Sequence, residues 1–217
     1  MALSVGNTTT ASGNTASSIS FAHNNNGNFL ILNVSGDNDA AAINTVTYNG
    51  EAMFKWEARG NVSVNYYVYQ LVNPSQGSNN IVISFLSGGV DDSISAVAIS
   101  FINADTSPSV IGNDETDPSR EFASGDSAGP AQVTITSSAK NSIIVDCVTT
   151  RGMTLTVDGS QTQVMNIAAG AIVGGSSYKK QVSPAGVTMS WTLGTSGRWI
   201  VFAFEVREKS LPKTVIF

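Results

Sequence analysis

The chain contains a single histidine and a single cysteine, so the residue types that carry most acid–base and metal chemistry are scarce. His23 lies in FAHNNNGN at an expected strand end, far in sequence from any nucleophile-elbow pattern, and we expect a surface or turn histidine. Cys147 lies in the apolar run SIIVDCV, where a thiol behaves as a small buried hydrophobe. One histidine and one cysteine cannot supply a usual zinc site. We therefore expect no catalytic residues, no metal, no cofactor and no enzyme.

Acidic side chains group in stretches that we expect to be loops, SGDNDA, GGVDDS and GNDETDPS. Oxygen-rich loops of this kind are where calcium binds. None has the spacing of an EF-hand, and short acidic loops are usually solvated turns, which is the interpretation that we favour. The residues on which a calcium ion would depend are Asp37, Asp39, Asp91 and Asp92.

Aromatic residues suggest a carbohydrate-binding alternative. Neighbouring tyrosines in VNYYVYQLV point to opposite faces of a strand, so one of them should face away from the core if the sheet has a wet face. Half-buried tyrosines are also ordinary in strands, which is the favoured interpretation. The residues that could stack on a sugar are Trp56, Tyr66 and Tyr67.

The composition is 41% hydrophobic and only 12% charged, with Ser, Thr, Asn and Gly in place of charges, which is typical of β-sandwiches. A net charge of −5 leaves no basic stripe for phosphates, so we expect no nucleic-acid partner. No run approaches the eighteen apolar residues of a membrane span, and the start MALSVGNTTTASGNTASS lacks the basic and apolar regions of a secretory signal. We expect no membrane partner.

Two kinds of strand pattern run through the chain. GVTMSWTLG and MTLTVDG alternate apolar and polar residues, which predicts one buried and one solvated face. NFLILNV, SAVAISFI and RWIVFAFEV are apolar on both faces, which predicts strands covered on both sides. Turn residues such as YNGE, NPSQG and SPAG separate these runs, as hairpins require.

The strand motifs occur twice in the same order. NFLILNV corresponds to NSIIVDCV, VTYNG to LTVDG, NPSQGSNNIVISF to SPAGVTMSWTL, and SAVAISFI to WIVFAFEV. We predict an all-β, jelly-roll-like β-sandwich domain over 1–207, built from pseudo-repeated halves at about 17–104 and 131–207. Each half has few strands, so we expect one sheet from each to pack face to face, with two tandem small sandwiches as the alternative.

The motifs VTYNGEAM, YQLVNPSQGSNNIVISF, GSQTQ and VTMSWTLG together resemble a β-sandwich module of phage virion proteins and large bacterial surface proteins. The resemblance covers about residues 28 to 207 and concerns core strands and turns, so it specifies the fold better than the function. It implies a capsid decoration or accessory virion protein, made in the host cytoplasm and located in the virion. The expected partners are a capsid or other virion protein and further copies of the chain.

The segments outside the repeat are the expected contact regions. Residues 104–130 form a long connection with few apolar residues, and the arm 208–217 ends on an apolar terminus. Such an arm could add a strand to a neighbour's sheet, or fold back on its own domain. Strand exchange into a filament is a third alternative. The residues predicted to bind a partner are Leu211, Val215, Ile216 and Phe217 in the arm, with Val110, Ile111 and Phe122 in the connection.

Overall fold

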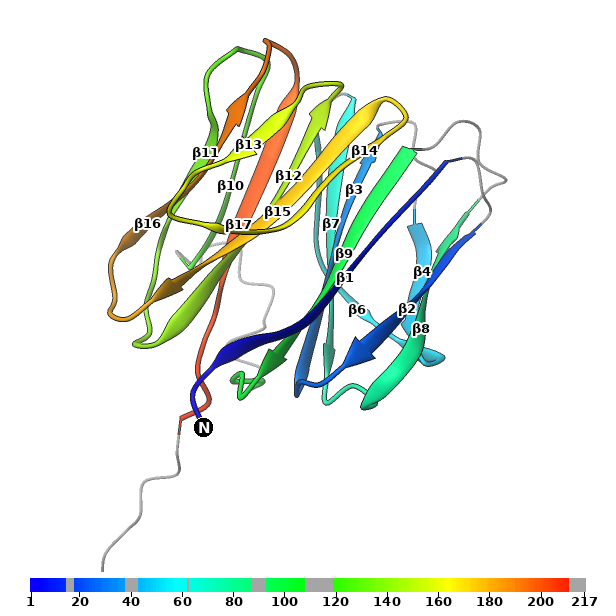
Figure 1. Ribbon diagram of the computed structural model, residues 1–217, viewed down its shortest axis with the longest axis vertical. Coiled ribbons are helices and arrows are strands. Elements are labelled where there is room, and N and C mark those ends of the chain that lie inside the picture. The colour runs from blue at the N-terminus through cyan, green and yellow to red at the C-terminus, as the bar shows by residue number, and fades with distance from the viewer. Residues whose placement is uncertain (15–17, 38–42, 62, 87–92, 108–118, 211–217) are drawn as a thin grey trace, which may run out of the picture.

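In the computed structural model the described part of the chain omits residues 15–17, 38–42, 62, 87–92, 108–118 and 211–217. All the regular secondary structure in this part of the chain is β-strand, and all strand pairs are antiparallel (Figure 1). This confirms the predicted all-β class.

The first half forms a five-stranded sheet in the order β1-β9-β3-β7-β6 and a four-stranded sheet in the order β2-β8-β4-β5. Without β6, consecutive strands are divided between the two sheets as in an eight-stranded jelly roll. The strands are β1 (Ser4–Asn14), β2 (Ser18–Asn25), β3 (Phe29–Asp37), β4 (Ile43–Tyr48), β5 (Glu51–Ala52), β6 (Phe54–Asn61), β7 (Val64–Val72), β8 (Gly77–Phe85) and β9 (Ser93–Ile102).

The second half repeats this topology position for position, which confirms the pseudo-repeat. Its sheets have the orders β10-β17-β12-β15-β14 and β11-β16-β13, and only a counterpart of β5 is missing among the described strands. The strands are β10 (Arg120–Gly125), β11 (Ala131–Thr136), β12 (Ser142–Arg151), β13 (Leu155–Val157), β14 (Thr162–Ala169), β15 (Ile172–Gln181), β16 (Gly186–Leu193) and β17 (Trp199–Val206).

The four sheets stack as four layers, with the two five-stranded sheets in the middle (Figure 1). A first-half core, around Leu30, Leu32 and Val34, fills the space between the first two sheets. A second-half core, around Trp191 and Met189, does the same in the other half. A central core joins the two five-stranded sheets. Each half therefore encloses its own core, which differs from the expected arrangement with one sheet from each half.

The difference arises from two strands that the sequence patterns did not reveal. β1 has the sequence SVGNTTTASGN, without apolar alternation, and β10 lies within the segment expected to be a long connection. Both are edge strands, paired with β9 and β17 respectively. Each half thus has enough strands to close a two-layered sandwich of its own.

The local patterns are otherwise confirmed. β3, β9, β12 and β17 are buried along almost their whole length because each lies between two cores. β16 alternates, with four inward apolar residues from Val187 to Leu193. Asn49 and Gly50 both have positive φ angles, which gives the two-residue turn between β4 and β5 that YNGE predicted.

Candidate functional site

His23 is fully buried, so the expectation of a surface histidine is wrong. Its Nε2 lies 2.8 Å from Ser100 Oγ, whose own hydroxyl donates to Asn25 Oδ1 at 2.7 Å. Nε2 therefore carries the proton, while Nδ1 accepts from Thr9 Oγ1 at 3.0 Å. Burial lowers the pKa of His23 to about 4, because a charged imidazolium would lose its hydration. The ring is a neutral, hydrogen-bonded part of the first half.

Cys147 is fully buried in the central core, as predicted, and burial raises the pKa of its thiol to about 12. Its neighbour Asp146 is a buried carboxyl group that sequence reasoning missed. The Asp146 carboxylate accepts hydrogen bonds from Ser177 N at 2.6 Å, Trp191 Nε1 at 2.8 Å, Ser177 Oγ at 2.9 Å and Gln161 Nε2 at 3.3 Å. An acidic residue alone in the run SIIVDCV was the available signal.

Two effects oppose each other at Asp146. Burial raises the pKa of the carboxyl to about 7, although the hydrogen bonds from Trp191 and Ser177 act to lower it. Gln161 completes the network by accepting from Ser190 N at 2.7 Å. Because the four groups around Asp146 satisfy its oxygens from within the second half, this cluster explains packing rather than substrate chemistry.

Of the four residues on which a calcium ion would depend, only Asp37 lies in the described part of the chain. Asp37 lies in β3 rather than in a loop, is buried, and bonds Arg151 Nη1 of the other half at 3.0 Å. Asp39, Asp91 and Asp92 lie outside the described residues. No three His, Cys, Asp or Glu side chains come together as a metal site in the described part of the chain.

Two of the three residues proposed to stack on a sugar, Trp56 and Tyr66, are buried, so neither offers an exposed platform. Trp56 is 6% exposed and packs edge-on against Phe204 with ring centroids 4.8 Å apart. Tyr66 is fully buried and stacks on Phe202 at 5.1 Å. Tyr67 is half-buried against the first-half core. Trp56 and Tyr66 are covered because the second half lies on this face of the sheet, which the sequence of one strand could not indicate.

Among the residues predicted to bind a partner, Phe122 alone lies in the described part. It is 45% exposed on β10, and the Arg59 guanidinium of the first half lies 4.9 Å from its ring centroid. The others, Val110, Ile111, Leu211, Val215, Ile216 and Phe217, lie outside the described residues.

The best-defined surface feature is the base of the C-terminal arm, which we call the arm root (residues 208–210). Glu208 bridges to Ala104 just beyond β9, and its Oε1 accepts from Leu3 N at 3.1 Å. Its Oε2 accepts from Asn141 Nδ2 of the second half at 3.1 Å. Lys209 N donates to the Asn103 carbonyl at 3.0 Å. The root thus links the N-terminus, the first half and the second half.

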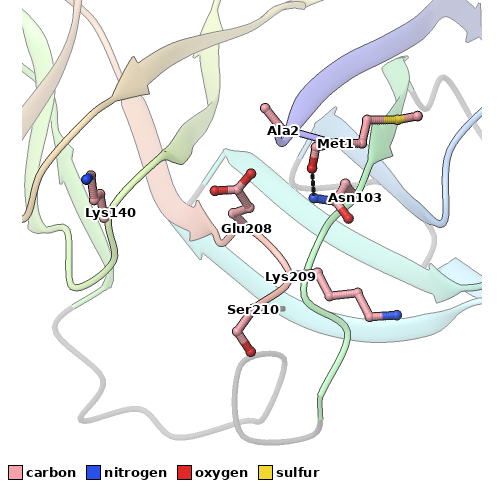
Figure 2. Close-up of a pocket in the computed structure, with 7 residues that line it drawn as sticks. All are labelled: Met1, Ala2, Asn103, Lys140, Glu208, Lys209 and Ser210. Carbon is pink, nitrogen blue, oxygen red and sulfur yellow. Dashed lines mark hydrogen bonds between the residues drawn. The ribbon is translucent and has the colours of Figure 1, made fainter. Parts of the chain in front are cut away.

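A half-open cavity of about 520 Å³ lies at the root. Figure 2 shows the hydrogen bond from Asn103 Nδ2 to the Met1 carbonyl across it. The amino groups of Lys140 and Lys209 point to opposite sides, away from Glu208, so they do not converge on one point as an anion site would require (Figure 2). The cavity is the seam where the N-terminus meets the arm root.

Just before the root, Glu205 near the end of β17 is bonded to the connection between β11 and β12. Its carboxylate accepts from Ser137 Oγ at 2.7 Å, Ser138 Oγ at 2.8 Å and Arg207 Nε at 3.0 Å. Burial alone would raise the pKa of Glu205, but the hydrogen bonds from these groups outweigh it and lower the pKa to about 2. The strand that leads into the arm is therefore firmly fixed.

No protein-family model matches the chain, and a search of curated proteins finds no significant match. No helix in the described part is long and apolar enough to cross a membrane. The comparisons therefore add no family to the fold described above.

Proposed function

We propose that the chain is a non-enzymatic structural protein of virions, a decoration or accessory protein that binds and stabilises an assembled protein shell. One observation carries this proposal: the arm root is fixed by Glu208 and Lys209 where both halves and the N-terminus meet. Residues 211–217, with the apolar ending Val215–Phe217, therefore continue from a rigid base. A binding segment held at its base loses less conformational freedom on binding than one attached loosely.

The mechanism that we propose is multivalent clamping. Several copies on a shell would each be bridged to their neighbours through the arm, and linked contacts of this kind bind more tightly than any one of them alone. The resemblance of VTYNGEAM and VTMSWTLG to phage virion modules supplies the kind of shell. Phe122, exposed beside the first half, would be a second contact.

Cosedimentation tests the proposal. Shells purified from the organism that encodes the chain are mixed with full-length protein or with a variant that lacks residues 211–217. We expect full-length protein to sediment with the shells and the truncated variant to stay in the supernatant. A full-length protein that does not sediment with shells, and is absent from purified particles by mass spectrometry, would overturn the proposal.

A further inference from the structure

The two lateral sides of the central core are built differently. On one side, β6 and β10 meet, Trp56 packs on Phe204, and Arg59 lies over Phe122. β6 also carries Lys55, Glu57 and Arg59 along its length. Charged side chains on an outer strand discourage pairing with another chain. This side is closed and protected.

On the other side, β14 packs against β1 and β9. β14 has the sequence TQVMNIAA, without a charge, and is the outermost strand of its sheet. Among the described strands it pairs only with β15. Val5, Val164 and Ile167 at this side pack on the central core but remain partly exposed. An uncharged outer strand beside partly covered apolar side chains is a template for an added strand.

We propose that β14 is a docking strand, and that residues 211–217 of a second copy pair with it. This inference rests on the proposed function in treating the arm as a binding segment. LPKTVIF has the β-branched and aromatic residues that favour strands, and its alternation gives Val215 and Phe217 one face. That face would cover Val164 and Ile167 and extend the central core.

Lengths agree with this pairing and bear on which copy supplies the arm. Seven residues span about 23 Å as a strand, close to the eight residues of β14. The arm root is bonded to Asn103, beyond one end of β9, whereas Ala171, just past β14, is bonded to Ser93 at the other end. The ten residues of β9 span about 33 Å, beyond the ~25 Å reach of a seven-residue segment. A chain's own arm therefore cannot reach as far as Ala171, and we assign the arm that pairs along the whole of β14 to a second copy.

Light scattering and peptide binding test the pairing. Full-length protein should have a concentration-dependent mass above the monomer, and the variant lacking 211–217 should be a monomer. A synthetic peptide of residues 210–217 should bind the truncated protein. Ala168→Lys, at an exposed position of β14, should weaken that binding by at least about tenfold because it places a charge at the docking strand.

Thr192→Lys is the matched control, since Thr192 is also exposed but lies on β16, inside its sheet. It should bind the peptide as the parent does. A monomeric full-length protein, an oligomer that survives truncation, or equal peptide binding by the Ala168→Lys variant would each overturn the pairing.

Disulfide cross-linking identifies the partner copy. A truncated chain with Ala168→Cys is mixed with a full-length chain with Ile216→Cys, so that a cross-link can form only between copies. In the proposed pairing these two side chains lie on the same face, opposite to the face of Ile167 and Val215. Cys147 is buried and stays unreactive. A cross-linked dimer is expected only from the mixture, and its absence under oxidising conditions would contradict the proposal. If copies cross-link but do not bind shells, the proposed function is wrong and the pairing stands. If the full-length protein is a monomer that binds shells and truncation abolishes that binding, the pairing is wrong and the proposed function stands.

Discussion

The two halves share one topology but fill their cores differently. The inward positions of β3 are Leu30, Leu32 and Val34, whereas on β12 an aspartate, Asp146, stands between Ile144 and Val148. In the first half a buried titratable group lies on β2 instead, where His23 bonds Ser100. The same backbone thus accepts an aliphatic or a carboxylate centre, provided that the carboxylate finds hydrogen-bond donors.

The largest effect is expected from placing a carboxylate in the first-half core without the hydrogen-bond donors that surround Asp146 in the second half. Leu32→Asp would bury a carboxylate among aliphatic side chains, and we expect it to lower the free energy of unfolding by more than about 4 kcal/mol. Leu32→Ala, the control for lost volume, should cost about 3 kcal/mol. Urea unfolding followed by tryptophan fluorescence measures both. Equal costs would show that the two cores tolerate charge alike.

The reverse change is the second test. Asp146→Leu would leave Ser177 N and Trp191 Nε1 buried without an acceptor, and we expect a loss of about 3 kcal/mol in the same unfolding experiment. Trp191→Phe in the Asp146→Leu background removes one of these orphaned donors. It should therefore cost less than Trp191→Phe alone, and strictly additive losses would mean that the donors are not what makes Asp146 necessary.

His23 in the first half and Asp146 in the second half make the stability depend on pH in opposite directions. The pKa of His23 is lowered from 6.5 to about 4, so the stability that its neutral ring contributes is present above pH 6.5 and lost as the pH falls toward 4. The pKa of Asp146 is raised from 3.8 to about 7, so stability is instead lost as the pH rises from about 4 to 7. The two effects largely cancel between pH 4 and 6.5.

Single substitutions reveal each slope. In Asp146→Asn, stability should fall on acidification below pH 6.5, and in His23→Gln it should rise on acidification from pH 7 to 4. Each slope is at most about 1.4 kcal/mol per pH unit. Denaturation midpoints measured across this range check the prediction, and two variants with slopes of the same sign would refute it.

The smallest effect concerns the central core, where a polar atom is left without a partner. The Tyr66 hydroxyl is buried and has no hydrogen-bond partner within the described residues. Tyr66→Phe keeps the ring stack on Phe202 and removes that hydroxyl. We expect unchanged stability or a gain of up to about 1 kcal/mol, measured by thermal unfolding. A clear loss would indicate that this hydroxyl is satisfied as fully as Asp146 is.

The sequence alone determined the strands with strong patterns, the hairpin at Asn49 and Gly50, the buried Cys147 and the repeat itself. These features depend on neighbours along the chain, where a period of two and turn residues act directly. The polar strand β1 has no such pattern, because its place is set by pairing with β9 across the fold. The arm could be recognised as unusual, but not the root that holds it.

Tertiary structure decided what covers each apolar face. A strand that is apolar on both sides, such as β3 or β17, does not show in its own sequence which face meets its own sandwich and which meets the other half. Trp56 and Tyr66 therefore suggested an exposed aromatic platform until the second half was placed over them. Asp146 and His23 depend in the same way on distant donors and acceptors, because burial and hydrogen bonding are properties of residues brought together only by the fold.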